Sequence, residues 1–316
     1  MNLKAKLTIL AILAAAAVAI FMFQGLGGNL DYILPSRGKK VLAIVITGAA
    51  IAFATIIFQT ITNNRILTPS IIGLDSLYLL IQTVIIFIAG SGSLTIVNKN
   101  INFALSVGAM MGFALILYQL LFRGEGRNIY FLLLVGLIFG TFFESLSSFM
   151  QMLIDPNEFQ VVQDRMFASF NNVSTDLLTF SIIIILLVAL YFMRFAKYLD
   201  VLSLGKEHAI NLGVDYDYVV KRLLIIIVVL ISISTALVGP ITFLGLLVAN
   251  VAYEFLQTHR HKPLIIGGIL ISVVALIGGQ IVVERILTFS TTLSVIINFI
   301  GGVYFIYLLL KESKRW

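Results

Sequence analysis

Cysteine is absent from this chain of 316 residues, and charge is scarce. Without cysteine the chain has no structural disulfide, no thiolate metal site and no lipoprotein anchor. Only 11% of the residues are charged, against about a quarter in ordinary soluble domains. Because 60% are hydrophobic, the chain cannot cover itself with a water-facing surface, so most of its outer surface must face lipid.

The motifs of nucleotide-binding proteins and common hydrolases are also missing. The glycine–lysine pairs that begin at Gly38 and Gly205 lack the hydroxyl residue and the upstream glycine of a phosphate-binding P-loop. Neither H-E-x-x-H nor G-x-S-x-G occurs, and His259 and His261 make no zinc-binding pattern with the distant third histidine. We therefore expect a protein that is not an enzyme, with no metal site and no cofactor.

Apolar runs of about 20 residues, the length that crosses a bilayer, recur along the whole chain. They lack the alternation of barrel strands, which predicts an all-α integral membrane protein with a single polytopic domain over 1–316. The first run follows Lys4 and Lys6 as in a signal peptide, but its length and the lack of a cleavage site before Gln24 favour a retained helix. The ten predicted transmembrane helices lie at about 7–23, 41–61, 71–89, 101–122, 129–154, 177–195, 219–238, 243–256, 264–284 and 293–311.

The distribution of basic residues predicts the orientation. Ten spans place both termini on one side, and with a cytoplasmic N-terminus the inside segments hold fifteen of the 21 lysines and arginines and the outside segments six. This excess predicts that both termini are cytoplasmic. The net charge of +6 is spread over short clusters between apolar runs, so we expect no nucleic-acid partner.

Two loops are longer than a turn. The loop 155–176 lies outside, and the loop 196–218 lies inside and alternates apolar with charged residues. Short amphipathic helices in an inside loop predict a contact surface for another protein.

Two G-x-x-x-G pairs, Gly108/Gly112 and Gly136/Gly140, lie inside predicted spans. Glycines at this spacing let helix backbones approach closely. We interpret both pairs as sites of tight packing within the chain rather than as a dimer motif.

One acidic residue, Glu144, lies in the middle of the fifth span and is followed by Ser145, Ser147 and Ser148. This polar stretch is either the wall of a water-facing pathway or a carboxyl buried between helices, and the sequence leaves both open. A proton-coupled secondary transporter would need several such carboxylates, so a single one gives that function little support.

Three stretches, in order, resemble the iron–siderophore and vitamin B12 permeases of ABC importers, the FecCD-type family. They are 37–73, which carries Gly48-Ala49, Gln59, Asn64, Pro69 and Gly73; 204–213; and 239–247 with Asn250 and His261. The first stretch lacks the family's proline and second arginine, and Asn250 replaces a common histidine. The third stretch looks most like the catecholate-siderophore branch.

The resemblance implies a type II importer permease in a bacterial inner membrane that translocates iron(III)–siderophore complexes. The implied partners are a separate ATP-binding cassette subunit, a second identical or related permease, an extracytoplasmic solute-binding protein and the lipid bilayer. A haem or vitamin B12 permease is the alternative within this class, and a proton-coupled secondary transporter is the alternative outside it.

The resemblance also implies roles for particular residues. Basic residues at the outer face, here Arg37, Lys40 and Arg285, would dock acidic side chains of the binding protein. The translocation pathway would include Gln59, Glu144 and Ser148. Two short helices that turn at Gly205 would contact the ATPase subunit, through Leu204, Gly205, Lys206, Glu207, Ala209, Leu212 and Gly213.

Overall fold

A computed structural model of the chain describes residues 2–25, 30–122, 129–171 and 173–313. Each of the ten predicted apolar runs falls on one helix, and the described ranges contain no strand, which confirms the all-α prediction. Eight of these helices are long and apolar enough to cross a bilayer, whereas α3 and α12 are shorter. The ten helices are α1 (Leu3–Phe23), α2 (Leu30–Thr62), α3 (Leu74–Ala89), α5 (Lys99–Phe122), α6 (Ile129–Leu153), α8 (Thr175–Phe192), α11 (Tyr216–Val238), α12 (Leu244–Leu256), α13 (His261–Arg285) and α14 (Leu293–Ser313).

Five short helices connect the long ones. They are η1 (Pro69–Ile72), α4 (Leu94–Val97), α7 (Pro156–Met166), α9 (Ala196–Leu202) and α10 (Lys206–Asn211). Asp155 and Pro156 begin α7, because the Asp155 side chain accepts the Asn157 backbone N–H and proline fits the first helical turn. The predicted outer loop therefore contains a helix, and the predicted inner loop contains two.

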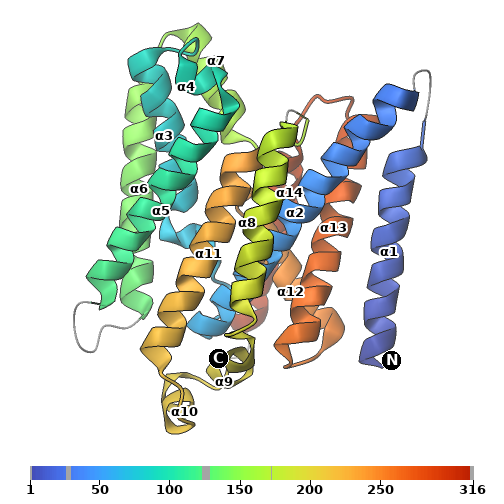
Figure 1. The fold of residues 1–316 in the computed structure, drawn as a ribbon, viewed down its shortest axis with the longest axis vertical. Coiled ribbons are helices and arrows are strands. Elements are labelled where there is room, and N and C mark those ends of the chain that lie inside the picture. The colour runs from blue at the N-terminus through green and yellow to red at the C-terminus, as the bar shows by residue number, and fades with distance from the viewer. Residues whose placement is uncertain (1, 26–29, 123–128, 172, 314–316) are drawn as a thin grey trace.

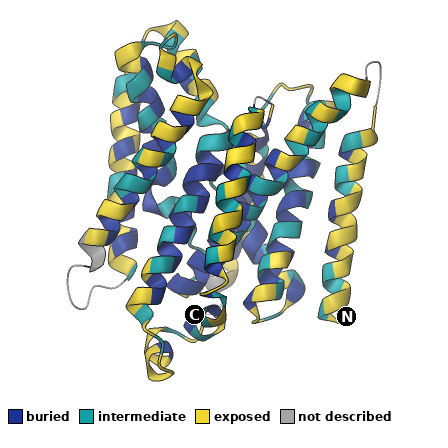
Figure 2. Ribbon diagram, viewed as in Figure 1, coloured by how far each residue is buried: buried dark blue, intermediate teal, exposed yellow. Residues whose placement is uncertain are grey.

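Helices α2 and α11 are the most buried of the eight long apolar helices, whereas α1, at one side of the bundle, and α8, at its front in this view, are mostly exposed (Figures 1 and 2). In α2 and α11, 67% and 72% of the residues in the apolar stretch of the helix are buried, against 17% in α1 and α8. The exposed apolar side chains of α1 and α8 suit contact with lipid or with another membrane protein.

Helix α2 begins eleven residues before the predicted start at 41, and it contains Pro35 close to its beginning. Hydropathy detects only the part of a helix that lies in lipid, so the polar first turns were invisible to it. Arg37 and Lys40 therefore lie on a helix and not in a loop.

Helix α3 begins inside the bundle. The residues just before it, η1 and Gly73, pack closely against α6. A Cβ atom on Gly136 would lie 2.8 Å from the Cα of Ile72, and one on Gly140 would lie 3.2 Å from the Cα of Gly73. Gly73 itself has a φ of +84°, which favours glycine. The prediction of close packing is confirmed for Gly136/Gly140.

The prediction of close packing within the chain is wrong for the other pair, Gly108/Gly112. A Cβ atom on Gly108 or Gly112 would meet no atom within 4 Å. These two glycines lie on a face of α5 that no other element of the described chain approaches closely, whereas Met110 and Ala114, on another face of the same turns, are fully buried. The same motif thus has different surroundings on α5 and α6, because a G-x-x-x-G pair permits close packing but does not require it.

A buried polar network joins α3 to α5. Gln82 donates to the Ser106 hydroxyl at 2.9 Å and to Asn102 Oδ1 at 3.2 Å, and Asn102 donates back to Gln82 Oε1 at 3.0 Å. All three side chains are buried. Such hydrogen bonds hold membrane helices together, where lipid offers polar groups no alternative partner.

The bundle has two distinct ends (Figure 1). At one end, Lys6 of α1 donates to the Leu256 carbonyl of α12, and Lys311 of α14 pairs with Glu254. The helices α9 and α10 lie at this end, and α4 and α7 lie at the opposite end. We call the first the inner end and the second the outer end.

Candidate functional site

Residues 196–213, which we call the coupling segment after the role that the resemblance implies, project from the inner end as α9 and α10 (Figure 1). Gly205 separates the two helices with a φ of +99° and a ψ of 164°, a conformation that is essentially restricted to glycine. Gly213 follows α10 with a φ of +82°. The predicted pair of helices with a turn at Gly205 is therefore present in the structure.

The two faces of the coupling segment differ in burial. Leu199 and Leu202 of α9 and Ala209 of α10 are buried against the rest of the chain. Leu204 and Leu212 are 56% and 64% exposed, and the charged residues Lys206 and Glu207, which lie between them in the sequence, are exposed as well. Exposed leucines with charges around them are typical of a surface that contacts another protein.

Ile210 is a third exposed apolar side chain on this surface, 49% exposed, which the sequence did not single out. It lies on α10 beside the buried Ala209. The positions of Ile210 and Ala209 could be told apart only once the orientation of this six-residue helix was known.

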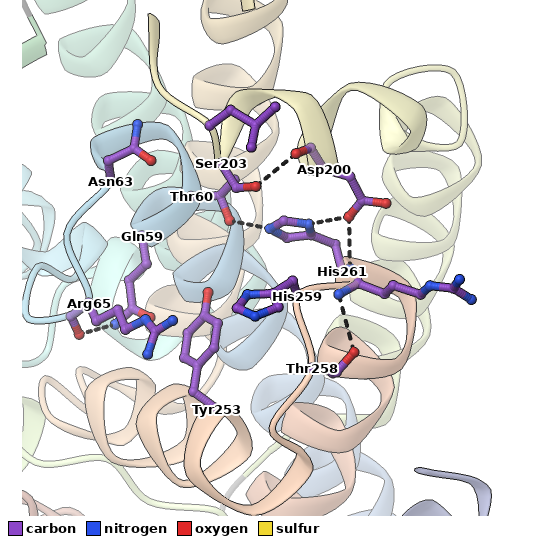
Figure 3. A pocket seen from close by; sticks show the side chains of 12 residues that line it. Gln59, Thr60, Asn63, Arg65, Asp200, Ser203, Tyr253, Thr258, His259 and His261 are labelled. Atoms are coloured by element: carbon purple, nitrogen blue, oxygen red, sulfur yellow. Dashed lines mark hydrogen bonds and ion pairs between the residues drawn. The ribbon is translucent and has the colours of Figure 1, made fainter. Parts of the chain in front are cut away.

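A cavity of about 520 Å³, the inner pocket, lies between the coupling segment and the membrane helices (Figure 3). Its walls come from the end of α2, from α9, and from the α12–α13 connection. The lining residues that matter most are Gln59, Thr60, Arg65, Asp200 and His261.

Gln59 lies in the wall of the inner pocket and is only 2% exposed. Its Nε2 donates to the Arg65 carbonyl at 2.6 Å, and Asn250 donates to the same carbonyl at 2.9 Å. The Arg65 guanidinium stacks over the Tyr253 ring at 4.4 Å. Gln59 thereby holds the chain that follows α2 in place.

Asp200 and His261 meet at the inner pocket. Asp200 Oδ1 lies 2.5 Å from His261 Nδ1 and accepts the His261 backbone N–H at 3.0 Å. Burial alone would raise the pKa of Asp200, but its hydrogen bonds and ion pairing with His261 outweigh burial and lower that pKa. The pair is 61 positions apart in sequence, so no local pattern could have predicted it.

Basic residues gather at the outer end, where α1, α2 and α13 meet. Arg37 Nη1 donates to the carbonyls of Phe21, Met22 and Gln24 at 2.9 to 3.1 Å. Arg285 Nη2 donates to the Gln24 carbonyl at 2.7 Å. Both arginines therefore satisfy the carbonyls at the end of α1, which have no partner within the helix.

Lys40 forms an ion pair with Glu284 of α13 at 2.9 Å, and Gln280 donates to the same carboxylate. The charge of Lys40 is thus compensated within the chain. Lys39, the next residue back, is exposed. The structure places Arg37, Lys40 and Arg285 together, and it adds Lys39 as an exposed cation that the sequence did not single out.

Glu144 and Ser148 lie one turn apart on α6, and both are exposed. The structure therefore decides against a carboxyl buried between helices of this chain. It also separates these two residues from Gln59, which is buried at the inner pocket. Within the described ranges, no group of three or more His, Asp or Glu side chains is placed to hold a metal ion.

Residues 7–311 match the FecCD transport family. The chain belongs to this family. It is 67% identical to the petrobactin import system permease protein YclO of Bacillus subtilis over 98% of each chain. It is 36% identical to the petrobactin import system permease protein FatC of Bacillus anthracis, over 89% of this chain and 79% of that one.

A solved structure shares the fold of this permease. It is a metal-chelate type ABC transporter in an inward-facing conformation, with a TM-score of 0.84 and 21% identity over 98% of this chain and all of the other. The family match and the two relatives confirm the predicted permease of an iron(III)–siderophore ABC importer, and they confirm that the chain is a transport subunit and not an enzyme.

Proposed function

We propose that this permease imports the iron(III) complex of petrobactin. The relative with 67% identity, which covers nearly all of both chains, is a petrobactin import permease, and a second relative with 36% identity has the same role. The two similarities support one ligand, and they agree with the resemblance of 239–247 to the catecholate-siderophore branch.

Uptake of radiolabelled iron tests this ligand. A strain that lacks the permease gene should lose uptake of iron(III)–petrobactin and regain it from a plasmid copy, while uptake of haem and vitamin B12 stays unchanged. Loss of haem or vitamin B12 uptake instead would assign the alternative ligand. Uptake that continues without a partner ATPase and stops with a proton uncoupler at fixed ATP would assign a secondary transporter.

The inner end faces the cytoplasm in this proposal, with both termini there, and the membrane is the bacterial inner membrane. Fifteen of the 21 basic residues lie in the segments that this orientation places inside. The coupling segment then contacts the ATPase subunit through Leu204, Ile210 and Leu212, with Lys206 and Glu207 at the rim.

The second permease, identical or related, covers the exposed face of α6, so that Glu144 and Ser148 line the pathway between the two subunits. A charged side chain that faces lipid in mid-membrane is expensive, and most such residues face water or protein. The exposure of Glu144 and Ser148 on one face of α6 supports this placement. Replacement of Glu144 by Gln should change uptake without changing the amount of assembled importer.

The outer cluster docks the solute-binding protein in this proposal, with Arg37, Lys40 and Arg285 at its base and Lys39 at its surface. Opposite charges across such an interface speed association and fix its orientation. Because Arg37 and Arg285 already bond to the end of α1, their reversal would also disturb that end. The Lys39→Glu variant avoids this, and it should slow capture of the binding protein, whereas unchanged capture would count against this dock.

A further inference from the structure

Three elements meet at the side chain of His261, the first residue of α13. Its Nδ1 lies 2.5 Å from Asp200 of α9, and its Nε2 lies 2.9 Å from the Thr60 hydroxyl near the end of α2 (Figure 3). His261 and Thr60 are 5% and 4% exposed. One buried imidazole therefore joins the coupling segment to two long membrane helices.

Asp200 also caps α13 from outside that helix. The first N–H groups of a helix have no partner within it, and Arg260 at the N-cap position supplies no side-chain acceptor. Asp200 Oδ1 accepts the His261 backbone N–H instead, and its negative charge is favourable at a helix N-terminus. If α9 moved while α13 stayed in place, the His261 backbone N–H and Nδ1–H would lose their acceptor on Asp200.

The hydrogen-bonding groups of Asp200, His261 and Thr60 allow this link whether His261 Nε2 accepts or donates. A carboxylate only accepts, so Nδ1 carries a proton. Thr60 has one hydroxyl proton and lies within reach of both Nε2 and the Ile56 carbonyl, at 2.9 and 2.8 Å. A neutral ring accepts that proton at Nε2, and a charged ring donates to Thr60 while Thr60 donates to Ile56. Both arrangements keep α9, α13 and α2 connected.

The other attachments of α9 are less directional. Leu199 and Leu202 are buried, but apolar contacts allow sliding because they depend little on orientation. Asn63 also donates to the Leu202 carbonyl, but at 3.5 Å this hydrogen bond is long and weak. Hydrogen bonds to a charged group fix both distance and angle. The three linked side chains therefore set the position of α9 relative to α13 and α2.

We propose that Asp200 and His261 are positioning residues that transmit movement of the coupling segment to α13 and α2. The inference rests on the proposed role of the coupling segment in ATPase contact. When the ATPase displaces α9, the Asp200 carboxylate, which is hydrogen-bonded to both the backbone and the ring of His261, pulls the start of α13. The His261 imidazole carries the displacement to the end of α2. The importer loses transport, but not ATP hydrolysis, when this link is cut.

The test uses the complete importer, with its ATPase, both permeases and binding protein, reconstituted in liposomes. We expect Asp200→Ala and His261→Ala to lower iron(III)–petrobactin uptake per ATP hydrolysed by about tenfold, since each removes charge-assisted hydrogen bonds. Asp200→Asn retains an acceptor oxygen and should retain most of the coupling. His261→Asn retains a donor toward Asp200 but does not reach Thr60, so its ratio should be intermediate.

The matched controls are Asp217→Ala and His259→Ala. Asp217 is an exposed acid in the first turn of α11, and His259 is an exposed neighbour of His261 in sequence. Both controls should keep the wild-type ratio, and the Asp200→Ala/His261→Ala double variant should be no worse than either single variant because both cut one link.

Two results would overturn the link: a wild-type ratio in both alanine variants, or a proportional loss of assembly, hydrolysis and uptake, which would mark a purely structural role. A wild-type importer that fails to transport iron(III)–petrobactin would refute the proposed ligand instead. Wild-type transport with unchanged ratios in the variants would refute the link alone.

Discussion

Replacement of Gly136 by alanine should destabilise the protein, although alanine is the better helix former. The new Cβ would lie 2.8 Å from Ile72 Cα and 2.9 Å from the Ile71 carbonyl oxygen. Both are backbone atoms of η1, so no side chain can rotate away to make room. The α6 helix and η1 would have to separate by about 0.7 Å to restore van der Waals contact.

The magnitude follows from two opposing terms. Overpacking in a close-packed interior costs about 1–3 kcal/mol. Alanine regains up to about 1 kcal/mol of helix propensity relative to glycine. We expect Gly136→Ala to lower the free energy of unfolding by about 1–2 kcal/mol, and Gly140→Ala to lower it less, because its nearest contact is 3.2 Å.

The matched control is Gly108→Ala on α5, where a Cβ meets nothing within 4 Å. This variant should be neutral or slightly stabilising in the same assay, which is equilibrium unfolding of the purified permease in mixed micelles titrated with sodium dodecyl sulfate. Equal responses of Gly136→Ala and Gly108→Ala would refute the packing argument, because the two glycines share one motif and differ only in their surroundings.

Further predictions concern the inner end and the polar network. Gly205→Ala should uncouple ATP hydrolysis from uptake without loss of assembly, because φ +99° costs a residue with a Cβ about 1–3 kcal/mol while the space around it is open; normal uptake per ATP would contradict this. The pKa of Asp200 is lowered, so its charge stabilises the fold above the ordinary value of 3.8 and loses that effect only as pH falls through the lower folded pKa. The difference in unfolding free energy between wild type and Asp200→Asn should therefore shrink as the pH falls below the ordinary value of 3.8; a difference that persists unchanged in stronger acid would be inconsistent with it. Gln82→Leu should lower the unfolding free energy by about 1 kcal/mol, because Asn102 loses its partner inside the membrane, and an unchanged stability would count against the network.

Hydropathy was sufficient to locate the ten long helices, because each apolar run must be helical in lipid. It could not locate the polar turns of α2 that hold Arg37 and Lys40, since these turns lie outside the apolar run. The turn at Gly205 was predicted from the resemblance of 204–213 to the family, and not from the local pattern alone. The exposure of Ile210 was not, because it depends on how α10 rests on its neighbours.

Long-range pairs were beyond sequence reasoning. Asp200 and His261 are separated by 61 positions, and neither residue belongs to a pattern that points to the other. The glycine pairs on α5 and α6 show the same limit, since only the neighbouring chain decides whether Gly108 or Gly136 is packed. A motif shows which close contacts a helix surface permits, and the tertiary structure decides whether another element makes those contacts.

The central claim is that the outer basic cluster and the coupling segment lie on opposite faces of the membrane, with the coupling segment in the cytoplasm. Because the chain has no cysteine, Lys39→Cys and Lys206→Cys each introduce a single thiol at an exposed position. A membrane-impermeant maleimide should label position 39 in intact spheroplasts and position 206 only after the membrane is opened. Labelling of both positions from the same side would contradict the account.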